Sequence, residues 1–239
     1  TGSVTATDED GVAGGLAGAI TGQLTSCYNT GAVTAAKAGQ LNGSGSKTIA
    51  CFSYVPGSTV PAFGTAKAGI ATMSYILGDE AKDADETGVA VLTAEQFKDS
   101  SLPYKLDTAD PQFRTYVWKA GTEHPELTSD PTEVSYKLAV SAKKGNVAAG
   151  GSVTFKAGGN LAGEEGVVTS YGTSYEITFT NAEGYSVKIE GMPEDAVKSE
   201  NGSTVTYTGE LKDDVVVYYV YYKPGSTGAF DNEPEDGIY

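Results

Sequence analysis

The feature that most constrains the fold is a glycine-rich segment that returns, in degraded form, one period later. Residues 11–33 read GVAGGLAGAITGQLTSCYNTGAV, and Cys27 is matched by Cys51 at an offset of 24 residues. Gly15 and Gly39 keep the same offset. A period of roughly 20–50 residues is typical of stacked repeats, in which each repeat buries its apolar face only against its neighbours. The pattern favours an elongated β-solenoid over a globular catalytic domain.

The same segment predicts which residues turn and which point inward. A coil of a parallel β-helix turns several tight corners, and glycine takes a positive φ most readily there. We therefore expect corners at Gly14-Gly15, Gly18, Gly22 and Gly31. Strand alternation would line the interior with Leu16, Ile20, Leu24, Cys27 and Val33.

The two cysteines follow from this period. Equivalent positions on neighbouring parallel strands lie about 4.8 Å apart with parallel side chains, whereas a disulfide needs Cβ atoms at about 3.8 Å. We therefore predict that Cys27 and Cys51 are two buried free thiols that pack as small hydrophobes.

The pattern G-G-L-A-G-x-x-x-G-x-L-x-x-C-Y-N-T-G-x-V, which residues 14–33 carry, resembles the GLUG repeat of bacterial extracellular and cell-surface proteins. Weaker copies cover residues 37–54, where Asn42–Ser46 replace the apolar start, and residues 66–77. The stretch 115–127 resembles the W-x-x-G-x-x-Y/H-P-x-L segment that closes such arrays. The resemblance implies a short right-handed parallel β-helix whose open end is capped by that stretch.

Two further signals organise the first half of the chain. Residues 78–88, GDEAKDADETG, predict a polar acidic loop, and residues 93–98 predict a short helix with Thr93 as N-cap and Gln96 completing a capping box. The breaker-rich run Thr128–Thr132 is the best domain boundary. We assign residues 1–130 to the repeats and their cap.

After Tyr136 the pattern changes to conventional strands, predicted at residues 136–142, 152–156, 174–180, 185–189, 203–208 and 215–223. Turns are expected at residues 181–184 and at Asn201-Gly202, the latter of type I′. The G-Y-x-V, N-G-x-x-x-T-Y and final strands are similar to bacterial surface immunoglobulin-like repeats. Residues 131–223 are thus expected to form an immunoglobulin-like β-sandwich, and residues 224–239 an acidic linker or tail.

Composition and net charge limit the classes of partner that this chain is expected to bind. The net charge is −15 with no basic patch, which disfavours nucleic acid and anionic membrane surfaces. No apolar run approaches the roughly 20 residues of a membrane helix, so we expect no membrane insertion by this chain. The chain begins Thr1-Gly2-Ser3, which we interpret as a processed or excised form with any anchor outside it.

Catalytic and metal chemistry finds little support in the residues. His124 is the only histidine, and we interpret it as structural, as we do Cys27, because no partner residues lie near either one. The acidic clusters at residues 8–10 and 79–86 are expected to be solvated faces. Residues 231–237 evoke a calcium loop but lack glycine at position six. We predict no catalytic, cofactor-binding or metal-binding residues and no cofactor.

The tyrosine-rich last strand has two interpretations. Tyr218 and Tyr222 share one face and Tyr219 and Tyr221 the other, so one set is expected in the core and the other half exposed, with core packing favoured over a sugar platform. Asn42-Gly43-Ser44 and Asn201-Gly202-Ser203 match glycosylation sequons, and we interpret both as turns.

These patterns predict an all-β, two-domain, non-enzymatic segment of a secreted or cell-surface bacterial protein. The expected role is adhesion or a stalk, with a host protein, matrix protein or glycan as partner, and the chain is expected to be a monomer. The alternatives are a fragment of a polysaccharide-active β-helix enzyme and a carbohydrate-binding module. The single arginine, Arg114, and the few acids inside the repeats disfavour the enzyme.

Overall fold

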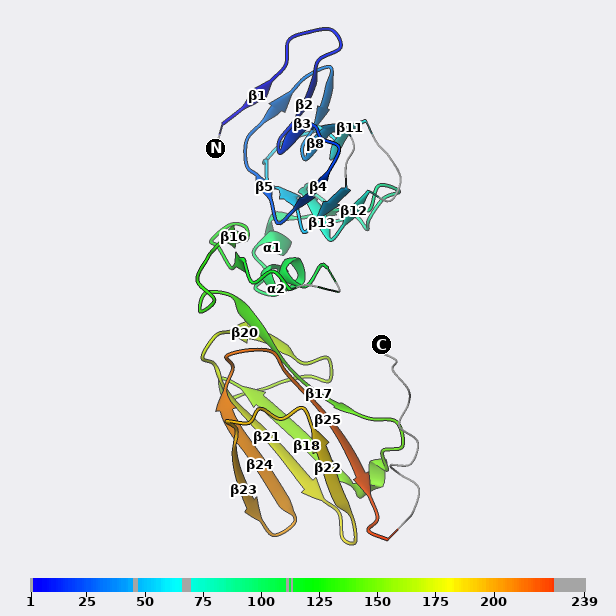
Figure 1. Cartoon of the computed structure of the whole chain (residues 1–239), viewed down its shortest axis with the longest axis vertical. Helices are drawn as coiled ribbons and strands as arrows, with labels where there is room; N and C mark the ends of the chain where they lie inside the picture. The colour runs from blue at the N-terminus through cyan, green and yellow to red at the C-terminus, as the bar shows by residue number, and fades with distance from the viewer. Residues whose placement is uncertain (1, 45–46, 66–69, 111, 113, 226–239) are drawn as a thin grey trace. The chain divides into compact units, whose positions relative to one another are not determined.

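The computed structural model describes residues 2–44, 47–65, 70–110, 112 and 114–225. The chain divides into two units, Thr1–Ser135 and Tyr136–Tyr239, so the division follows Ser135, whereas the sequence pattern placed it after Asp130. β-strands are the main regular structure of both units, which confirms the all-β class (Figure 1). Within the described residues, no helix is long and apolar enough to cross a membrane.

The strands of the first unit pair in parallel between successive passes of the chain. We call these passes the first layer (β1–β5), the second layer (β6–β10) and the third layer (β11–β13). Leu24 pairs with Thr48, which pairs in turn with Ala71, so the sequence period appears as strand register. The ladders are β1 (Val4–Thr5) with β6 (Val33–Thr34); β2 (Val12–Gly14) with β7 (Lys37–Gly39); β3 (Ala17–Ala19), β8 (Asn42–Ser44) and β11 (Phe63–Thr65); β4 (Gln23–Thr25), β9 (Lys47–Ile49) and β12 (Ala71–Thr72); and β5 (Tyr28–Asn29), β10 (Phe52–Ser53), β13 (Ser74–Leu77) and β14 (Val89–Leu92).

The corners differ from the prediction. None of the expected corner glycines, Gly14-Gly15, Gly18, Gly22 and Gly31, has a positive φ. A left-handed backbone is found instead at Ser26, Ala50 and Met73, at φ 52°, 54° and 42°, which occupy equivalent positions in the three layers.

Close backbone approach explains glycine at two of these repeat positions. A Cβ on Gly14 would lie 2.0 Å from the carbonyl oxygen of Ala17, and one on Gly39 would lie 2.0 Å from that of Asn42. Since real Cβ atoms do not approach so closely, a side chain at either position would force the turn apart. Gly14 and Gly39 are needed for space, while the repeated positive φ falls at Ser26, Ala50 and Met73.

The apolar residues of the first unit form two clusters on opposite sides of the sheet β5-β10-β13-β14. Cys51 is buried with Leu41 and Phe63 on one side, where Leu16, Leu24 and Cys27 pack half-buried, as predicted for interior residues. Of the other predicted interior residues, Val33 is buried and Ile20 half-buried. On the other side, Phe52 packs with the residues Phe97, Leu106 and Trp118 of the segment that follows the strands.

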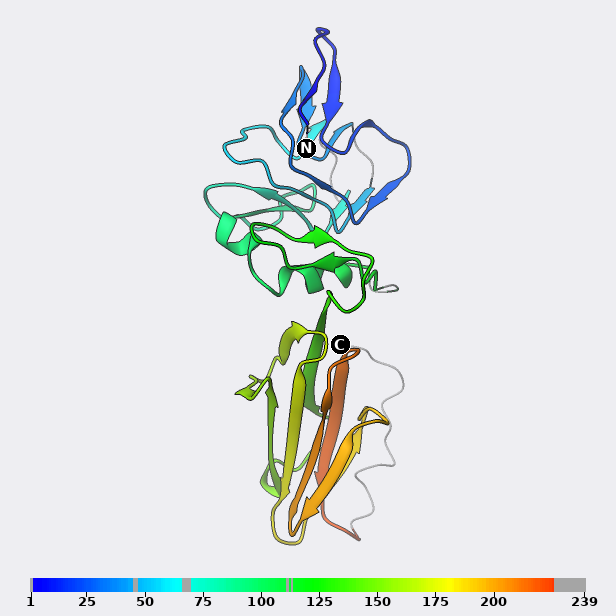
Figure 2. The same ribbon diagram turned by 90° about the vertical axis from the view of Figure 1, so that its left-hand side faces the viewer.

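That following segment covers the side of the layers rather than their end. It comprises α1 (Ala94–Phe97), α2 (Leu102–Asp107) and a hairpin of β15 (Trp118–Lys119) and β16 (Glu126–Leu127). This segment is the green part of the first unit in Figures 1 and 2, where α1 lies next to β13 in Figure 1. The Trp118 ring lies 6.0 Å from Tyr28 of the first layer and 5.4 Å from Phe52 of the second. Because one side chain contacts two layers, the expected cap across the open end is wrong in position.

The helices themselves follow local rules. The predicted capping box is confirmed: the Gln96 backbone N–H donates to Thr93 Oγ1 at 3.3 Å, and the Thr93 N–H donates to Gln96 Oε1 at 2.9 Å. Helix α2 was not expected from the sequence. Pro103 in its first turn supplies the fixed φ that favours a helix start.

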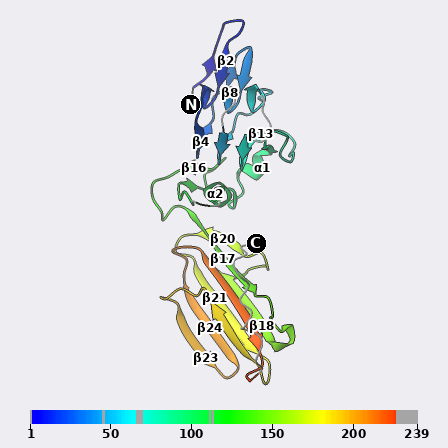
Figure 3. The same ribbon diagram turned by 45° about the vertical axis from the view of Figure 1, so that its right-hand side comes forward.

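The second unit consists of two facing sheets, with strand orders β20-β17-β25-β22 and β19-β18-β21-β24-β23 (Figure 3). Val217 and Tyr221 of the first sheet and Ile177 and Phe179 of the second are buried. The six predicted strands are found within two residues of their expected ends, and β19, β20 and β23 are additional. The strands are β17 (Ser135–Ala142), β18 (Gly151–Ala157), β19 (Asn160–Leu161), β20 (Val167–Ser170), β21 (Ser174–Asn181), β22 (Ser186–Glu190), β23 (Val197–Asn201), β24 (Thr204–Glu210) and β25 (Val215–Tyr222), with a 3-10 turn at Ala148–Gly150.

Three turn predictions need correction. Asn201 pairs with Thr204, so the hairpin loop is Gly202-Ser203; only Gly202 has a positive φ, at 59°, which fits type II′ rather than type I′. Residues 181–184 form a turn between the two sheets, not a hairpin, because β21 and β22 belong to different sheets. The sequon at Asn42–Ser44 is strand β8, not a turn, and Asn42 is fully buried.

Some predicted features lie outside the described residues. These are residues 45–46 of the second repeat, residues 66–69 of the third, the candidate calcium loop at residues 231–237, and residues 226–239 of the tail.

Candidate functional site

His124 lies among aromatic rings of the first unit. Its ring centroid is 5.4 Å from that of Tyr28, 5.6 Å from that of Phe52 and 5.1 Å from that of Tyr54. Its Nδ1 is 2.8 Å from the carbonyl oxygen of Pro125. The half-buried ring thus joins the hairpin β15–β16 to the first two layers.

The two cysteines are free thiols in equivalent positions of the first and second layers. Cys51 is buried, whereas Cys27 is only half-buried, so the prediction of two buried thiols is right for Cys51 alone. The hydrogen bond with Cys51 lowers the pKa of Cys27 to about 7. The same bond, together with burial, raises the pKa of Cys51.

The predicted acidic loop is found between β13 and β14. Within this loop the Asp85 carboxylate is hydrogen-bonded: its Oδ1 accepts from the backbone N–H of Thr87 at 2.8 Å and from its hydroxyl at 2.5 Å. Burial opposes ionisation of Asp85, but these hydrogen bonds outweigh it and lower the pKa of the carboxyl. In the part of the chain that the structure describes, no three His, Cys, Asp or Glu side chains gather as a metal ion would require.

The two faces of β25 are distinct, as the tyrosine pattern predicts. Val217 and Tyr221 are buried on the inner face, while Tyr218 is 42% exposed on the outer face. Lys143 Nζ lies 5.9 Å from the centroid of the Tyr218 ring and is ion-paired with Glu190. A flat sugar platform needs several exposed coplanar rings, and along β25 Tyr218 is the exposed tyrosine.

A recess of about 520 Å³ lies over the other sheet of the second unit. Lys156 and Glu176 form an ion pair at 2.9 Å on one side of it, and Val197 and Thr208 line the other. Val197 is 66% exposed, so the recess is a wet depression of an exposed sheet face rather than an enclosed pocket.

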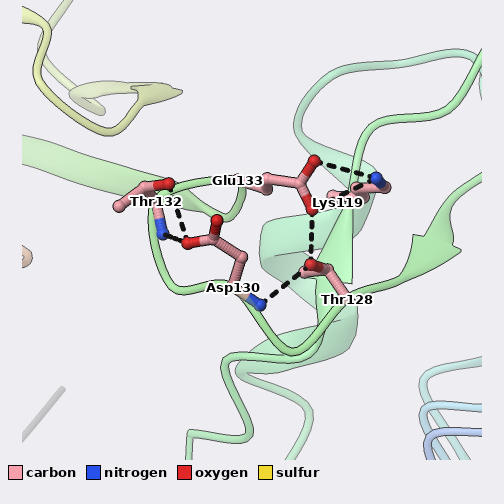
Figure 4. Close-up of polar contacts among 5 residues, drawn as sticks. All are labelled: Lys119, Thr128, Asp130, Thr132 and Glu133. Carbon is pink, nitrogen blue, oxygen red and sulfur yellow. Dashed lines mark hydrogen bonds and ion pairs between the residues drawn. The ribbon is translucent and has the colours of Figure 1, made fainter.

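A polar network fixes the segment that leads out of the first unit (Figure 4). Lys119 Nζ of β15 lies 3.0 and 3.1 Å from the two carboxylate oxygens of Glu133. The Thr128 hydroxyl donates to Glu133 Oε2 at 2.5 Å and accepts from the Asp130 N–H at 3.0 Å. Asp130 Oδ1 accepts from the N–H and the hydroxyl of Thr132, at 2.9 and 2.8 Å.

The electrostatics of the network follow its geometry. The Thr128 hydroxyl and then Lys119 lower the pKa of Glu133, and the backbone and hydroxyl of Thr132 lower the pKa of Asp130. Glu133 in turn raises the pKa of Lys119. Asp130 and Glu133 are exposed and Lys119 is partly exposed, so the network orders the segment more than it stabilises the fold.

Arg114 reinforces the end of the same segment. Its guanidinium stacks on the rings of Tyr104, at 4.8 Å from the centroid, and Tyr116, at 4.4 Å. Its Nη2 donates to the carbonyl oxygen of Ser135, the last residue of the first unit. Sequence reasoning identified Arg114 only as the single arginine, and the flanking tyrosines were the signal for its stacking.

Asp107 is the most buried carboxyl of the described residues, at 1% exposure. Its Oδ1 accepts from the Thr115 hydroxyl at 2.8 Å and from the N–H groups of Val117 and Trp118 at 2.9 and 3.1 Å. Burial nevertheless raises its pKa. Asp107 therefore positions the loop that places Trp118 against the layers.

The first and last strands of the second unit pair in parallel. The register of β17 and β25 runs from Leu138 with Val215 to Ala142 with Tyr219. Sequence patterns predicted both strands but not their pairing, because a parallel contact between strands so far apart in sequence leaves no local signal. Comparison with family models, curated proteins and solved structures finds no match to this chain.

Proposed function

We propose that this chain is a binding and spacer segment of a secreted or surface-attached bacterial protein. In this proposal the first unit is a short right-handed parallel β-helix of the GLUG type, and the second is an immunoglobulin-like sandwich. The parallel layers with a 24-residue register and the two facing sheets support these assignments. The residue patterns described above connect them to bacterial surface proteins.

The observation that carries the spacer role is the parallel pairing of β17 with β25. Tension on the second unit enters at the start of β17 and leaves at the end of β25. Because the two strands are parallel, this tension shears their backbone hydrogen bonds together instead of breaking them one at a time. Forced unfolding is governed by the unfolding rate, and bonds that break together raise its barrier.

The segment before β17 also suits a spacer. Residues 128–133 are bound to Lys119 of β15, Val134 forms an antiparallel bridge with Lys119, and the Ser135 carbonyl accepts from Arg114. Because residues 128–135 are held in place by these contacts, tension on the chain is expected to reach Ser135, the first residue of β17, without first extending a loose linker.

The binding role is assigned to exposed sheet faces, with a host protein, matrix protein or glycan as the partner. Stacked layers present extended surfaces on which several weak contacts add. The exposed face around Tyr218 and the recess beside Val197 are the places in the second unit to test. A polysaccharide-active enzyme fragment and a carbohydrate-binding module are the alternatives.

Single-molecule pulling tests the spacer role. We expect a higher unfolding force for the second unit when it is pulled from the two chain ends than when it is pulled from its N-terminal end and the Gly202 hairpin, because the second geometry does not shear β17 against β25. Val216→Pro, in β25, should lower the end-to-end force, whereas Lys198→Pro, on the exposed edge strand β23, should leave it unchanged. Equal forces in the two pulling geometries would refute the spacer role.

An array of glycans and matrix proteins, probed with the purified chain with and without calcium, tests the binding role. A saturable hit that Tyr218→Ala weakens, and Tyr171→Ala does not, supports binding at the β25 face; both tyrosines are exposed, at 42% and 37%. Release of oligosaccharides from any array glycan would instead support the enzyme alternative. If no array component is bound with or without calcium, the binding role is refuted and the spacer role is the one that remains.

A further inference from the structure

The tripeptide Asn-Gly-Ser occurs at two places in this chain, and its surroundings differ between them. At the first place, Asn42 is at 0% exposure in β8, which pairs on one side with β3 and on the other with β11. At the second place, Asn201, Gly202 and Ser203 are all exposed at the tip of the hairpin that joins β23 to β24. The chain thus holds one short sequence both in a packed ladder and at an open turn.

An asparagine followed by glycine can react with its own backbone, because glycine has no side chain to cover its N–H. The glycine nitrogen attacks the side-chain carbonyl carbon of the asparagine. An N–C bond forms, the bond from that carbon to the amide nitrogen breaks, and ammonia leaves with the proton of the glycine N–H. Water then adds to either carbonyl of the cyclic imide and opens it. The products are aspartate and isoaspartate, and no oxidant or reductant is needed.

The folded chain leaves room for this reaction at Asn201. A Cβ built on Gly202 would have no other atom within 4 Å, so the space around the attacking nitrogen is open. Within the part of the chain that the structure describes, no hydrogen bond holds the Asn201 side-chain amide. The amide is therefore free to rotate toward the Gly202 nitrogen, and water reaches the imide that forms.

Packing removes that room at Asn42. A Cβ on Gly43 would lie 2.5 Å from the carbonyl oxygen of Gly18 and 2.6 Å from Cγ1 of Val12. The Asn42 amide has no hydrogen-bond partner, so enclosure by the neighbouring layers is what holds it. Ring closure there would have to displace packed atoms, and the interior excludes the water that opens the imide.

We propose that Asn201 is a site of spontaneous deamidation in the folded chain, which converts it to aspartate and isoaspartate while Asn42 keeps its amide. Water is the co-reactant and ammonia the leaving group. The inference does not depend on the proposed function, because it follows from the exposure and packing of two identical tripeptides.

The modification falls where it can release an edge strand. In isoaspartate the main chain runs through the side-chain carbons, which lengthens the backbone at Asn201 and disturbs its pairing with Thr204. The turn of a hairpin sets the register of its strands, and among the described residues β23 pairs only with β24 (Figure 3). The other side of the turn is held, because the Asn181 N–H donates to the Ser203 carbonyl at 2.8 Å. Isoaspartate should therefore loosen β23 and leave β24 in place.

Peptide mass spectrometry tests the site on the full chain. One sample is stored folded and one in denaturant, both in warm, mildly alkaline buffer, and digestion in acid stops the reaction. In the folded sample we expect the Asn201 peptide to gain the mass of an amide-to-acid change and the Asn42 peptide to stay unchanged. In denaturant both should change at similar rates, because the tripeptides are identical. An unchanged Asn201 in the folded sample after the denatured one has converted, or equal change at both sites in the folded sample, would overturn the proposal.

The variant Asn201→Gln isolates the effect on β23, because glutamine keeps the amide but would have to close a larger ring. It should gain no mass on storage. Hydrogen exchange in Val197–Asn201 should be faster in stored wild type than in the stored variant, while freshly prepared samples of the two should agree. Equal exchange in the two stored samples, with the wild type converted to isoaspartate, would overturn the loosening of β23.

Discussion

Cys27 and Cys51 are placed in the same way in successive layers: the sulfur of each lies close to the carbonyl oxygen two residues earlier, 3.2 Å from that of Thr25 and 3.3 Å from that of Ile49. Their surroundings nevertheless differ, because among the described residues Cys51 lies between two layers and is buried, whereas Cys27 packs against the second layer and is half-buried. One repeat position therefore carries two thiols of different reactivity.

Alkylation should separate these two thiols. With a pKa of about 7, Cys27 is half ionised near neutrality, so iodoacetamide should modify one thiol of the native chain, and the rate should rise as the pH passes through about 7. Cys51→Ala removes the hydrogen bond that lowers the pKa of Cys27 and should move this profile to higher pH. Denaturant without reductant should expose a second thiol by mass spectrometry. A failure to label either thiol in denaturant would mean that a disulfide is present.

Ser26→Gly should stabilise the first unit. Ser26 has a φ of 52°, and its buried hydroxyl has no hydrogen-bond partner, so glycine removes both penalties. We expect the free energy of unfolding to rise by about 1 kcal/mol, less than the full left-handed penalty because glycine gains chain entropy when unfolded. The neighbouring change Thr25→Gly, in an ordinary strand conformation, should lower it by a similar amount. Chemical denaturation measures both, and a loss of stability in Ser26→Gly would contradict the assigned strain.

Asp107 should make stability depend on pH. Burial raises its pKa in the folded state, so the folded chain binds the proton more tightly than the unfolded chain does. Its contribution to stability therefore rises as the pH falls from neutrality toward the ordinary aspartate pKa of about 4. Asp107→Asn keeps an acceptor for the loop N–H groups and should remove this dependence. Denaturation of both proteins across this pH range is the measurement, and parallel curves would contradict the prediction.

Glu133→Gln should loosen the segment 128–134 without unfolding the chain. The change removes the charge that pairs with Lys119 and weakens the acceptor for Thr128. Hydrogen exchange should speed up in this segment alone, and global stability should change by less than about 0.5 kcal/mol because the pair is exposed. Glu123→Gln, at an exposed position of the β15–β16 loop, is the matched control.

Low pH should have the same effect on hydrogen exchange in residues 128–134 as the Glu133→Gln change. The pKa values of Asp130 and Glu133 are lowered in the folded state, so their hydrogen bonds persist below the ordinary carboxyl range and are lost as the pH falls through the lowered values. Exchange in the segment should therefore accelerate only in that acidic range in the wild type, and at no pH should Glu133→Gln be slower.

The features predictable from sequence are those set by local chemistry. The Thr93–Gln96 capping box and the six strands of the second unit depend on residues close together in the chain. The 24-residue offset of Cys27 and Cys51 predicted the neighbouring positions of these thiols, because a repeat keeps its register.

The features that the sequence did not predict are of two kinds. Some depend on contacts between residues far apart in the sequence, and others involve a residue type that can serve more than one structural purpose. Glycine serves both positive φ and close approach, so Gly14 was assigned the first use and has the second. The parallel pairing of β17 with β25, and the stacking of Trp118 across two layers, are set by packing that no local pattern encodes. Of the candidate sites, the sequence indicated the tyrosines of β25, but not the network around Glu133.

The position of Trp118 on the side of the layers has a consequence for how such a chain evolves. A cover placed across the end of a stack must be rebuilt whenever the stack is extended, whereas a cover on its flank keeps its contacts with Tyr28 and Phe52 when a further repeat is added to the stack. Duplication or loss of one repeat in the gene would then change the length of the array in a single step and leave its closure intact.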